Sequence, residues 1–239
     1  MLPVRGGDHV SMTGIPEGPW LNVGSGPSSP PGWISFDGSW QARLAGHPAL
    51  AQIGRRTLGI DIGHWPKGVR HRDIRRGLPY ATGSVAVVYA SHILEHLHRG
   101  DTVRFLTHVR QLLKPGGVCR VVVPDVHAIV TWYLANRDEP PAGKTRSSSD
   151  LLMGMLMLRA PDARAGNPVL GLVRRAADLH EHKWMYDQEG LQAVFEEAGF
   201  ARPAGRHYLE SVIPREPLER VERADRVCGG AGVCVEAIK

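Results

Sequence analysis

A glycine turn followed by two aspartates is the feature of this sequence with the clearest chemical potential. Residues 21–26, Leu-Asn-Val-Gly-Ser-Gly, read as a buried strand that runs directly into a turn, and Asp37 and Asp73 follow where two later strands would end. Gly24 and Gly26 let the backbone approach a ligand closely, and a carboxylate at the next strand end can accept hydrogen bonds from ribose hydroxyls. The order of these residues predicts a site for a ligand that carries a ribose.

Histidines are the candidates for proton transfer. His92 directly follows a predicted buried strand, at the carboxyl edge where open α/β sheets place their ligands. A neutral imidazole there can act as a general base, and the alternative is that His92 hydrogen-bonds the backbone and shapes the pocket. His92 and His96 share a helical face, but His98 points elsewhere and no nearby Cys completes a ligand set. We therefore expect no metal site.

A second group of histidine and aromatic residues precedes the last predicted helix. His182, Trp184 and Tyr186 stand there, and together with His96 they are our candidates for residues that line a substrate pocket. The alternative, which the sequence leaves open, is that this segment is a packed connection between two elements.

Composition indicates a globular protein. The chain has 239 residues, of which 42% are hydrophobic and 22% charged, enough to bury a sizeable core. No apolar run approaches the roughly 18 to 20 residues that span a bilayer, and residues 1–20 lack the apolar segment of a signal peptide. Cys119, Cys228 and Cys234 have no metal-ligand spacing and are expected to be reduced thiols. We expect a cytoplasmic protein without a membrane partner.

The formal net charge of +5 would permit an anionic partner. However, the basic residues are scattered along the chain and are not interleaved with aromatic residues. Nucleic-acid binding is therefore not expected. The sequence gives no indication of the oligomeric state.

The candidate residues require a sheet that gathers several strand ends at one edge. Buried apolar runs predict strands at 20–24, 33–36, 69–74, 84–90 and 118–123. Their alternation with helical patterns favours one seven-stranded, mostly parallel α/β sheet of the Rossmann-like type, with helices on both faces. The ten residues between Gly26 and Asp37 contain three prolines, so the first crossover is too short for a helix.

Capping residues and apolar stripes predict the helices. A helix that begins with Asp101 as its N-cap should be stopped by Lys-Pro-Gly-Gly at 114–117, and another should run from an Asp187 cap to Gly199. A shorter helix is expected within 39–52.

The remaining segments define the domain organisation. We expect a single domain over 1–239, an irregular arm at 1–19, and an insertion at 131–183 that caps the carboxyl edge of the sheet. Residues 212–238 should supply two antiparallel strands joined by a loop around 229–232.

Several ordered motifs together resemble one enzyme family, the class I S-adenosylmethionine-dependent methyltransferases, in the branch called type 11. The resemblance covers about 21–123 and 182–200. Its motifs are the segments 21–26, 32–37, 73–80, 89–97 and 113–117. Residues 182–200 are similar to the segment that precedes the sixth strand in members of this family.

The resemblance implies a cofactor site for S-adenosylmethionine and its product S-adenosylhomocysteine. The turn at 24–26 would face the methionine portion, Asp37 would hold the ribose hydroxyls, and Asp73 would meet the adenine. Asn22 departs from the family, since many members carry an acidic residue there. The implied cofactor-binding residues are Asn22, Gly24, Ser25, Gly26, Asp37, Asp73, Ile74 and Ser91.

The resemblance also implies an activity. We expect methyl transfer to an oxygen or nitrogen of a small molecule, such as a sugar or a secondary metabolite in natural product biosynthesis, with His92 as the candidate base. Methylation of a macromolecule (a glycan, protein or nucleic acid) is the first alternative. A non-catalytic module that retains the fold and binds the cofactor is the second. The sequence does not identify the acceptor.

Overall fold

The computed structural model describes residues 14–58, 63–138, 147–157, 181–227 and 232–239. Most of the predicted arm at 1–19 and two stretches of the predicted insertion at 131–183, namely 139–146 and 158–180, lie outside these ranges. Among the described residues, no helix combines the length and apolar character needed to cross a membrane.

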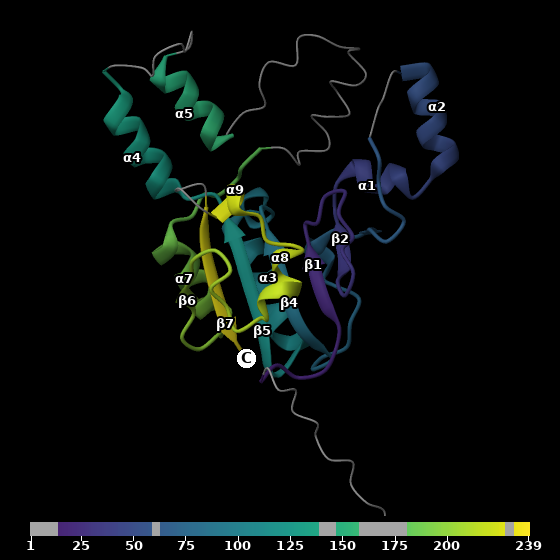
Figure 1. Cartoon of the computed structure of the whole chain (residues 1–239). Helices are drawn as coiled ribbons and strands as arrows, with labels where there is room; N and C mark the ends of the chain where they lie inside the picture. The colour runs from purple at the N-terminus through teal and green to yellow at the C-terminus, as the bar shows by residue number, and fades with distance from the viewer. Residues whose placement is uncertain (1–13, 59–62, 139–146, 158–180, 228–231) are drawn as a thin grey trace, which may run out of the picture.

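One sheet joins the strands that the structure describes (Figure 1). They are β1 (Trp20–Val23), β2 (Ile34–Asp37), β3 (Arg70–His71), β4 (Val85–Ser91), β5 (Leu113–Val123), β6 (Ala204–Gly205) and β7 (Val233–Ile238). Their order is β3-β2-β1-β4-β5-β7-β6. The first five strands are parallel, whereas β7 is antiparallel to both β5 and β6. The predicted seven-stranded, mostly parallel α/β sheet is confirmed.

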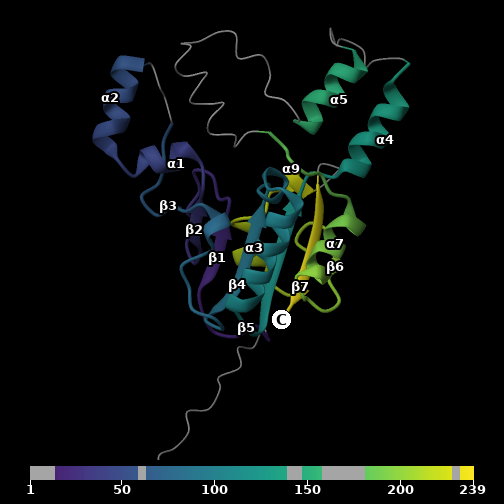
Figure 2. The ribbon, with the colours of Figure 1, turned by 180° about the vertical axis from the view of Figure 1, so that it is seen from behind.

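The central strands are buried on both faces. Every residue of β4 is buried, which explains why its sequence is a continuous apolar run. The helices α3 (Arg99–Leu112) and α7 (Gln188–Glu197) cover one face, while α8 (Arg215–Glu219) and α9 (Ala224–Val227) cover the other (Figures 1 and 2). Because successive side chains of a strand point to opposite faces, Val87 and Val88 enter two different cores.

The short first crossover has the form that the sequence predicts. No helix lies between β1 and β2, both of which the structure describes throughout, and the two strands pair in parallel with Val23 beside Phe36. Prolines at 27, 30 and 31 prevent a regular helix in this segment. As a result Asp37, at the end of β2, lies next to the glycine turn that follows β1.

Two helix predictions need correction. The helix expected within 39–52 is split into α1 (Trp40–Ala45) and α2 (Pro48–Leu58), since Pro48 favours the first position of a new helix. The long helix α3 starts at Arg99 with His98 as its N-cap, so the assignment of Asp101 as N-cap was wrong. Asp101 instead lies in the first turn and pairs with Arg104. The predicted Asp187 cap of α7 is confirmed, because its side chain accepts from the Gly190 N–H.

Two strand boundaries also differ. β3 is limited to Arg70–His71, because Asp73 accepts from the Arg75 N–H and so begins the 3₁₀ helix η1 (Ile74–Arg76). The Lys-Pro-Gly-Gly segment at 114–117 ends α3 as predicted but already belongs to β5, which starts at Leu113.

The predicted antiparallel pair within 212–238 was wrong. Only β7 lies in the described part of that range, and its antiparallel partners are β5 and the two-residue strand β6 at 204–205. Residues 215–219 and 224–227 are the helices α8 and α9 instead. Ion pairs at i, i+4 between Arg215 and Glu219 and between Arg220 and Glu216 support α8.

The predicted insertion begins with two helices, α4 (Val126–Asn136) and α5 (Ser148–Leu156). They pack against each other and project beyond the carboxyl ends of the parallel strands (Figure 1). The first helix thus starts five residues before the predicted boundary at 131. Met153 of α5 is 49% exposed, so this helix is not fully buried despite its apolar sequence. Residues 139–146 and 158–180 of the predicted insertion lie outside the described residues.

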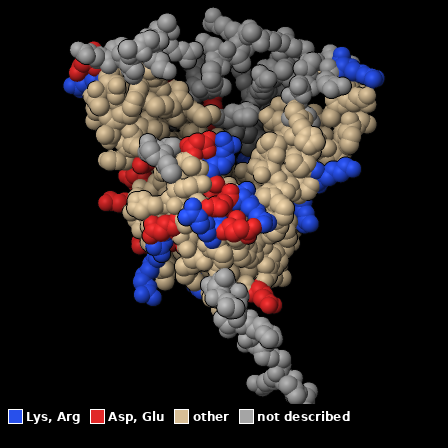
Figure 3. Space-filling model, viewed as in Figure 1, with Lys and Arg blue, Asp and Glu red and all other residues tan. Residues whose placement is uncertain are grey.

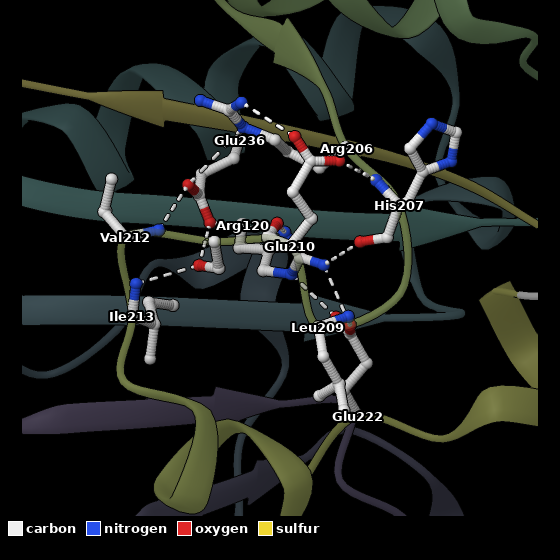
Figure 4. Close-up of polar contacts among 10 residues, drawn as sticks. Arg120, Arg206, His207, Leu209, Glu210, Val212, Ile213, Glu222 and Glu236 are labelled. Carbon is white, nitrogen blue, oxygen red and sulfur yellow. Dashed lines mark hydrogen bonds and ion pairs between the residues drawn. The ribbon is translucent and has the colours of Figure 1, made fainter.

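A buried ion cluster joins β5, β7 and the segment before α9 (Figure 4). Arg120 of β5 is fully buried, and its Nε and Nη2 donate to the two carboxylate oxygens of Glu222 at 2.7 and 2.8 Å. Nη1 donates to Glu236 of β7 at 3.3 Å and to the Glu210 carbonyl at 2.8 Å, and Nη2 also donates to the His207 carbonyl at 3.0 Å. All five guanidinium N–H groups are therefore satisfied inside the protein.

The surface over α8 and α9 carries charges of both signs. Figure 3 shows acidic and basic side chains intermingled on this face. Arg223, for example, pairs with Asp225 at 2.7 Å. The positive charge of this face is thus largely matched by acidic neighbours.

Candidate functional site

The glycine turn after β1 is built as the sequence predicts. Gly24 and Gly26 have φ angles of 73° and 55°, which a residue with a side chain rarely adopts. The N–H groups of Gly24 and Ser25 donate to the Phe36 carbonyl oxygen at 2.9 and 3.1 Å. A Cβ at Gly24 would come within 3.0 Å of Ile93, whereas a Cβ at Gly26 would meet no described atom within 4 Å. The turn therefore packs tightly on one side and is open to a ligand on the other.

Asp37 connects the end of β2 to this turn. One carboxylate oxygen accepts from the Gly26 N–H at 2.9 Å, and the other accepts from the Ser39 N–H at 2.8 Å. The residue is only 8% exposed. Each carboxylate oxygen has two lone pairs, so both can still accept from a hydroxyl of a ligand. The backbone bonds fix the carboxylate in one orientation beside the open side of the turn.

The residues around Asp73 are arranged mainly by local contacts. The Asp73 carboxylate accepts two hydrogen bonds from the Arg75 guanidinium, at 3.0 and 2.9 Å. These bonds hold the pKa of Asp73 below its usual value. Ile74 is buried in the core at 5% exposure. A contact of this pair with an adenine stays a prediction.

Two further predicted residues lie within the sheet near the same edge. Asn22 of β1 is 4% exposed and pairs across the sheet with Ser35 and Tyr89. Ser91 is the last residue of β4 and is 5% exposed. Its carbonyl oxygen lies 3.3 Å from the position that a Cβ at Gly24 would take. The ends of β1 and β4 thus meet at the glycine turn.

His92 is held at the carboxyl end of β4 in an unusual backbone conformation. Its φ angle is 53°, and its N–H donates to the Val122 carbonyl at 2.9 Å. Nδ1 lies 3.6 Å from a Glu95 carboxylate oxygen, and Nε2 is buried without a hydrogen-bond partner among the described residues. Burial, and next to it the charge of Arg226, lower the pKa of His92 to about 4. The imidazole is therefore neutral at physiological pH and can accept a hydrogen bond, while the low pKa makes it a weaker base than an ordinary histidine.

A polar cluster lies beside His92, in the 3₁₀ helix η2 (Leu94–His96) and the segment that crosses it. Glu95 is 1% exposed, and burial raises the pKa of its carboxyl group to about 8. His182 is 7% exposed, and burial and the neighbouring His96 lower its pKa to about 4. From the sequence, Glu95 is predicted together with His96 to anchor this helix to neighbouring loops, with a chemical role as the alternative. The sequence does not pair η2 with residue 182, because no local spacing links them.

The other two candidates for the substrate pocket have different surroundings. Trp184 is 47% exposed. Tyr186 is 2% exposed, packs in the core, and its hydroxyl donates to the Thr102 hydroxyl at 3.0 Å. Tyr186 therefore lies in a packed connection, the alternative that the sequence left open. A contact of Tyr186 with a substrate stays a prediction.

A cavity of about 240 Å³ lies on the outer side of η1 against α3, away from the glycine turn. Of the predicted cofactor residues, only Ile74 lines it. Its remaining walls include Arg76, Phe105 and His108. The cavity lacks both the turn and Asp37, so it is not the predicted ribose site.

A family model and a curated relative that match this chain are both methyltransferases. A family model described as a methyltransferase domain matches residues 20–202. A curated relative from Mycolicibacterium smegmatis, named as a probable S-adenosylmethionine-dependent methyltransferase, is 33% identical over 89 residues, which covers 34% of each chain. The match thus spans about a third of that relative.

Similar solved structures include two methyltransferases. A methyltransferase from Thermotoga maritima, described as a possible histamine N-methyltransferase, is 15% identical with a TM-score of 0.46, and the match covers 94% of this chain and 84% of that one. A methyltransferase from Archaeoglobus fulgidus is 14% identical with a TM-score of 0.46, over 93% of this chain and 86% of that one.

Proposed function

The chain belongs to the methyltransferase-domain family, a family of S-adenosylmethionine-dependent enzymes, and from that premise we propose that it methylates an oxygen or nitrogen atom of a small molecule. A sugar or a secondary metabolite of natural product biosynthesis is the substrate class we favour. The family matches the one that the sequence motifs resemble.

The observation that carries this proposal is the fixed carboxylate of Asp37 beside an open glycine turn. A nucleoside cofactor needs hydrogen-bond acceptors for its two ribose hydroxyls and a backbone that its chain can approach closely. Asp37 offers the acceptors, and Gly26 has free space where a side chain would otherwise stand. S-adenosylmethionine has no pyrophosphate, so the absence of a helix in the described first crossover does not remove a group that it needs. These residues fit the cofactor.

His92 is our candidate for the base. The cofactor supplies a methyl group on a positively charged sulfur, and the transfer is an in-line displacement that requires the acceptor atom to be aligned. When the acceptor is a hydroxyl, its proton must leave as the new bond forms. His92 Nε2 is buried and has no hydrogen-bond partner in the described part of the chain, so this atom can take that proton.

We infer that the acceptor binds next to the segment 182–184, beneath the predicted cap at 131–183. The N–H groups of Lys183 and Trp184 both donate to the Glu95 carbonyl, at 2.7 and 3.2 Å, which holds this segment against the end of β4. The exposed indole of Trp184 offers an apolar surface there. An inserted cap suits small substrates, because such ligands are usually largely enclosed.

A cytoplasmic location is part of the proposal. Cys119 and Cys234, the two cysteines that the structure describes, are unpaired and buried. Unpaired cysteines are typical of a reducing compartment.

The proposal is tested by turnover. We expect the protein to produce S-adenosylhomocysteine when S-adenosylmethionine is combined with a suitable member of a panel of small hydroxyl and amine acceptors. Parallel reactions with glycans, proteins and RNA test the first alternative, and a reaction without acceptor measures background hydrolysis. Turnover only with macromolecules would contradict the small-molecule assignment. Cofactor binding with no turnover on any acceptor would favour the non-catalytic module.

A further inference from the structure

A buried cluster of three potential metal ligands lies at the end of β4. Ligand atoms of Glu95, His96 and His182 all lie within 4.8 Å of one another. Neither carboxylate oxygen of Glu95 has a hydrogen-bond partner among the described residues, and the same is true of His182 Nδ1. Buried polar atoms are nearly always paired, because an unpaired one costs free energy. The cluster therefore lacks a group that would satisfy several of its acceptor atoms at once.

The surrounding backbone holds the cluster in place. The peptide groups of residues 183 and 184 donate to the Glu95 carbonyl, and the His182 N–H donates to the Met157 carbonyl at 3.0 Å. His96 Nδ1 lies 3.2 Å from the Glu181 carbonyl oxygen. A carbonyl can only accept, so Nδ1 carries the proton and Nε2 is the ring nitrogen with a lone pair. Carbonyl groups commonly orient metal-bound imidazoles in this way.

We propose that Glu95, His96 and His182 bind a divalent metal ion of the Zn²⁺ type. Two imidazoles and one carboxylate form a donor set that suits zinc, and three protein ligands leave a coordination position for water or a ligand. The ring centroids of the two histidines are 5.1 Å apart, so both rings reach the same small volume. The expectation of no metal site was based on His98, which is exposed and lies outside this cluster.

The charge balance of the cluster is compatible with a cation. Glu95 supplies the negative charge once the ion displaces the proton that burial favours on its carboxyl group, and both histidines are neutral ligands when they bind a metal. Arg226 is a nearby basic residue whose positive charge acts on both Glu95 and His92, and its backbone is in hydrogen-bond contact with His92. The bound ion would connect η2 directly to the segment at residue 182.

Metal binding can be measured on the full-length protein without a polyhistidine tag, after dialysis against EDTA. We expect calorimetric titration with Zn²⁺ to show one tight equivalent, and Co²⁺ to give visible absorption bands of a low-coordinate nitrogen and oxygen site. Glu95→Gln and His182→Ala should each weaken Zn²⁺ binding by about 100-fold or more, since even loss of an outer-shell partner can cost 10- to 100-fold. His98→Ala is the matched control and should bind as tightly as the wild type.

The titration contains neither cofactor nor acceptor, so its result is independent of the proposed methyl transfer. The proposal is overturned when the wild type binds no Zn²⁺ at micromolar concentration, or when His98→Ala loses as much affinity as the cluster variants. Thermal melting in EDTA checks that each variant is folded. If His182→Ala does not fold, the Co²⁺ spectrum of the wild type still decides, because a spectrum identical to that of aqueous Co²⁺ contradicts the site.

Discussion

Arg120→Met should lower the free energy of unfolding by about 3–5 kcal/mol, the usual cost of removing one partner of a buried ion pair. The substitution leaves Glu222 and Glu236 buried at 2% and 3% exposure without their shared cation. It also removes the donors that the Glu210 and His207 carbonyls accept from. Such a loss is a large part of a typical total stability of about 5–15 kcal/mol. Urea unfolding followed by circular dichroism measures it.

Arg223→Met is the matched control for this experiment. Its guanidinium also pairs with a carboxylate, that of Asp225, but the pair is exposed to solvent. Exposed pairs contribute little, so the unfolding midpoint should barely change. If Arg120→Met is too unstable to purify, Glu236→Gln provides a milder test that keeps one acceptor oxygen. Equal midpoints for wild type and Arg120→Met would show that the cluster does not stabilise the fold.

His92→Ala should lower kcat by about 10²-fold for a hydroxyl acceptor, the lower end of the usual contribution of a general base, because burial lowers the pKa of His92 to about 4 and makes it a weaker base than an ordinary imidazole. The affinity for S-adenosylhomocysteine should change little, because the ribose and backbone contacts expected to hold it come from Asp37 and from the turn at 24–26. Steady-state kinetics and calorimetric titration of the same preparations separate the two effects. The reason for the large effect is the buried Nε2, which has no hydrogen-bond partner among the described residues.

His92→Gln distinguishes a base from a pocket residue. Glutamine keeps a hydrogen-bonding side chain but cannot take the proton, so the variant should be nearly as impaired as His92→Ala. With an amine or an acidic phenol as acceptor, alignment dominates and glutamine should retain most of the activity. A glutamine variant with wild-type kcat on a hydroxyl acceptor would exclude the base role. His98→Ala, at an exposed histidine nearby, controls for general effects of the substitution.

The parts of the fold that the sequence predicted correctly are those set by local pattern. Valine-rich runs with both faces buried mark β4 and β5. The absence of a helix between the glycine turn and β2 was predictable because the connecting segment is short and rich in proline. Asp187 was predicted as a cap because its side chain makes a local bond to Gly190. By contrast, the N-cap of α3 is His98, which makes no side-chain hydrogen bond there. The start of α3 therefore could not be predicted from a capping residue.

What could not be predicted depends on contacts between distant segments. β6 is two residues long, too short for any sequence period, and it is recognised only by its pairing with β7. The hydroxyl of Tyr186 donates to Thr102, which is distant in the sequence, so this packed position could not be predicted from local pattern. The approach of His182 to Glu95 likewise appears only when the backbone bonds between 183–184 and η2 are known.

The central claim is that the turn at 24–26 and Asp37 hold S-adenosylmethionine or its product. Calorimetric titration of S-adenosylhomocysteine into wild type, Asp37→Ala and Asp37→Asn tests it most directly. A charged acceptor contributes about 1.5–3 kcal/mol per hydrogen bond, so Asp37→Ala should bind at least ten-fold more weakly. Asp37→Asn keeps one acceptor oxygen, so its affinity for S-adenosylhomocysteine should lie between those of the wild type and Asp37→Ala.

Two controls make this titration decisive. Glu196→Ala removes an exposed carboxylate from α7, which packs against α3, β6 and β7, and should bind S-adenosylhomocysteine like the wild type. Thermal melting shows whether loss of the Asp37 bonds to the Gly26 and Ser39 N–H groups has disturbed the fold. The account predicts one equivalent bound by the wild type and a selective loss in folded Asp37→Ala. A wild type that binds no S-adenosylhomocysteine, or an Asp37→Ala variant with undiminished affinity, would contradict it.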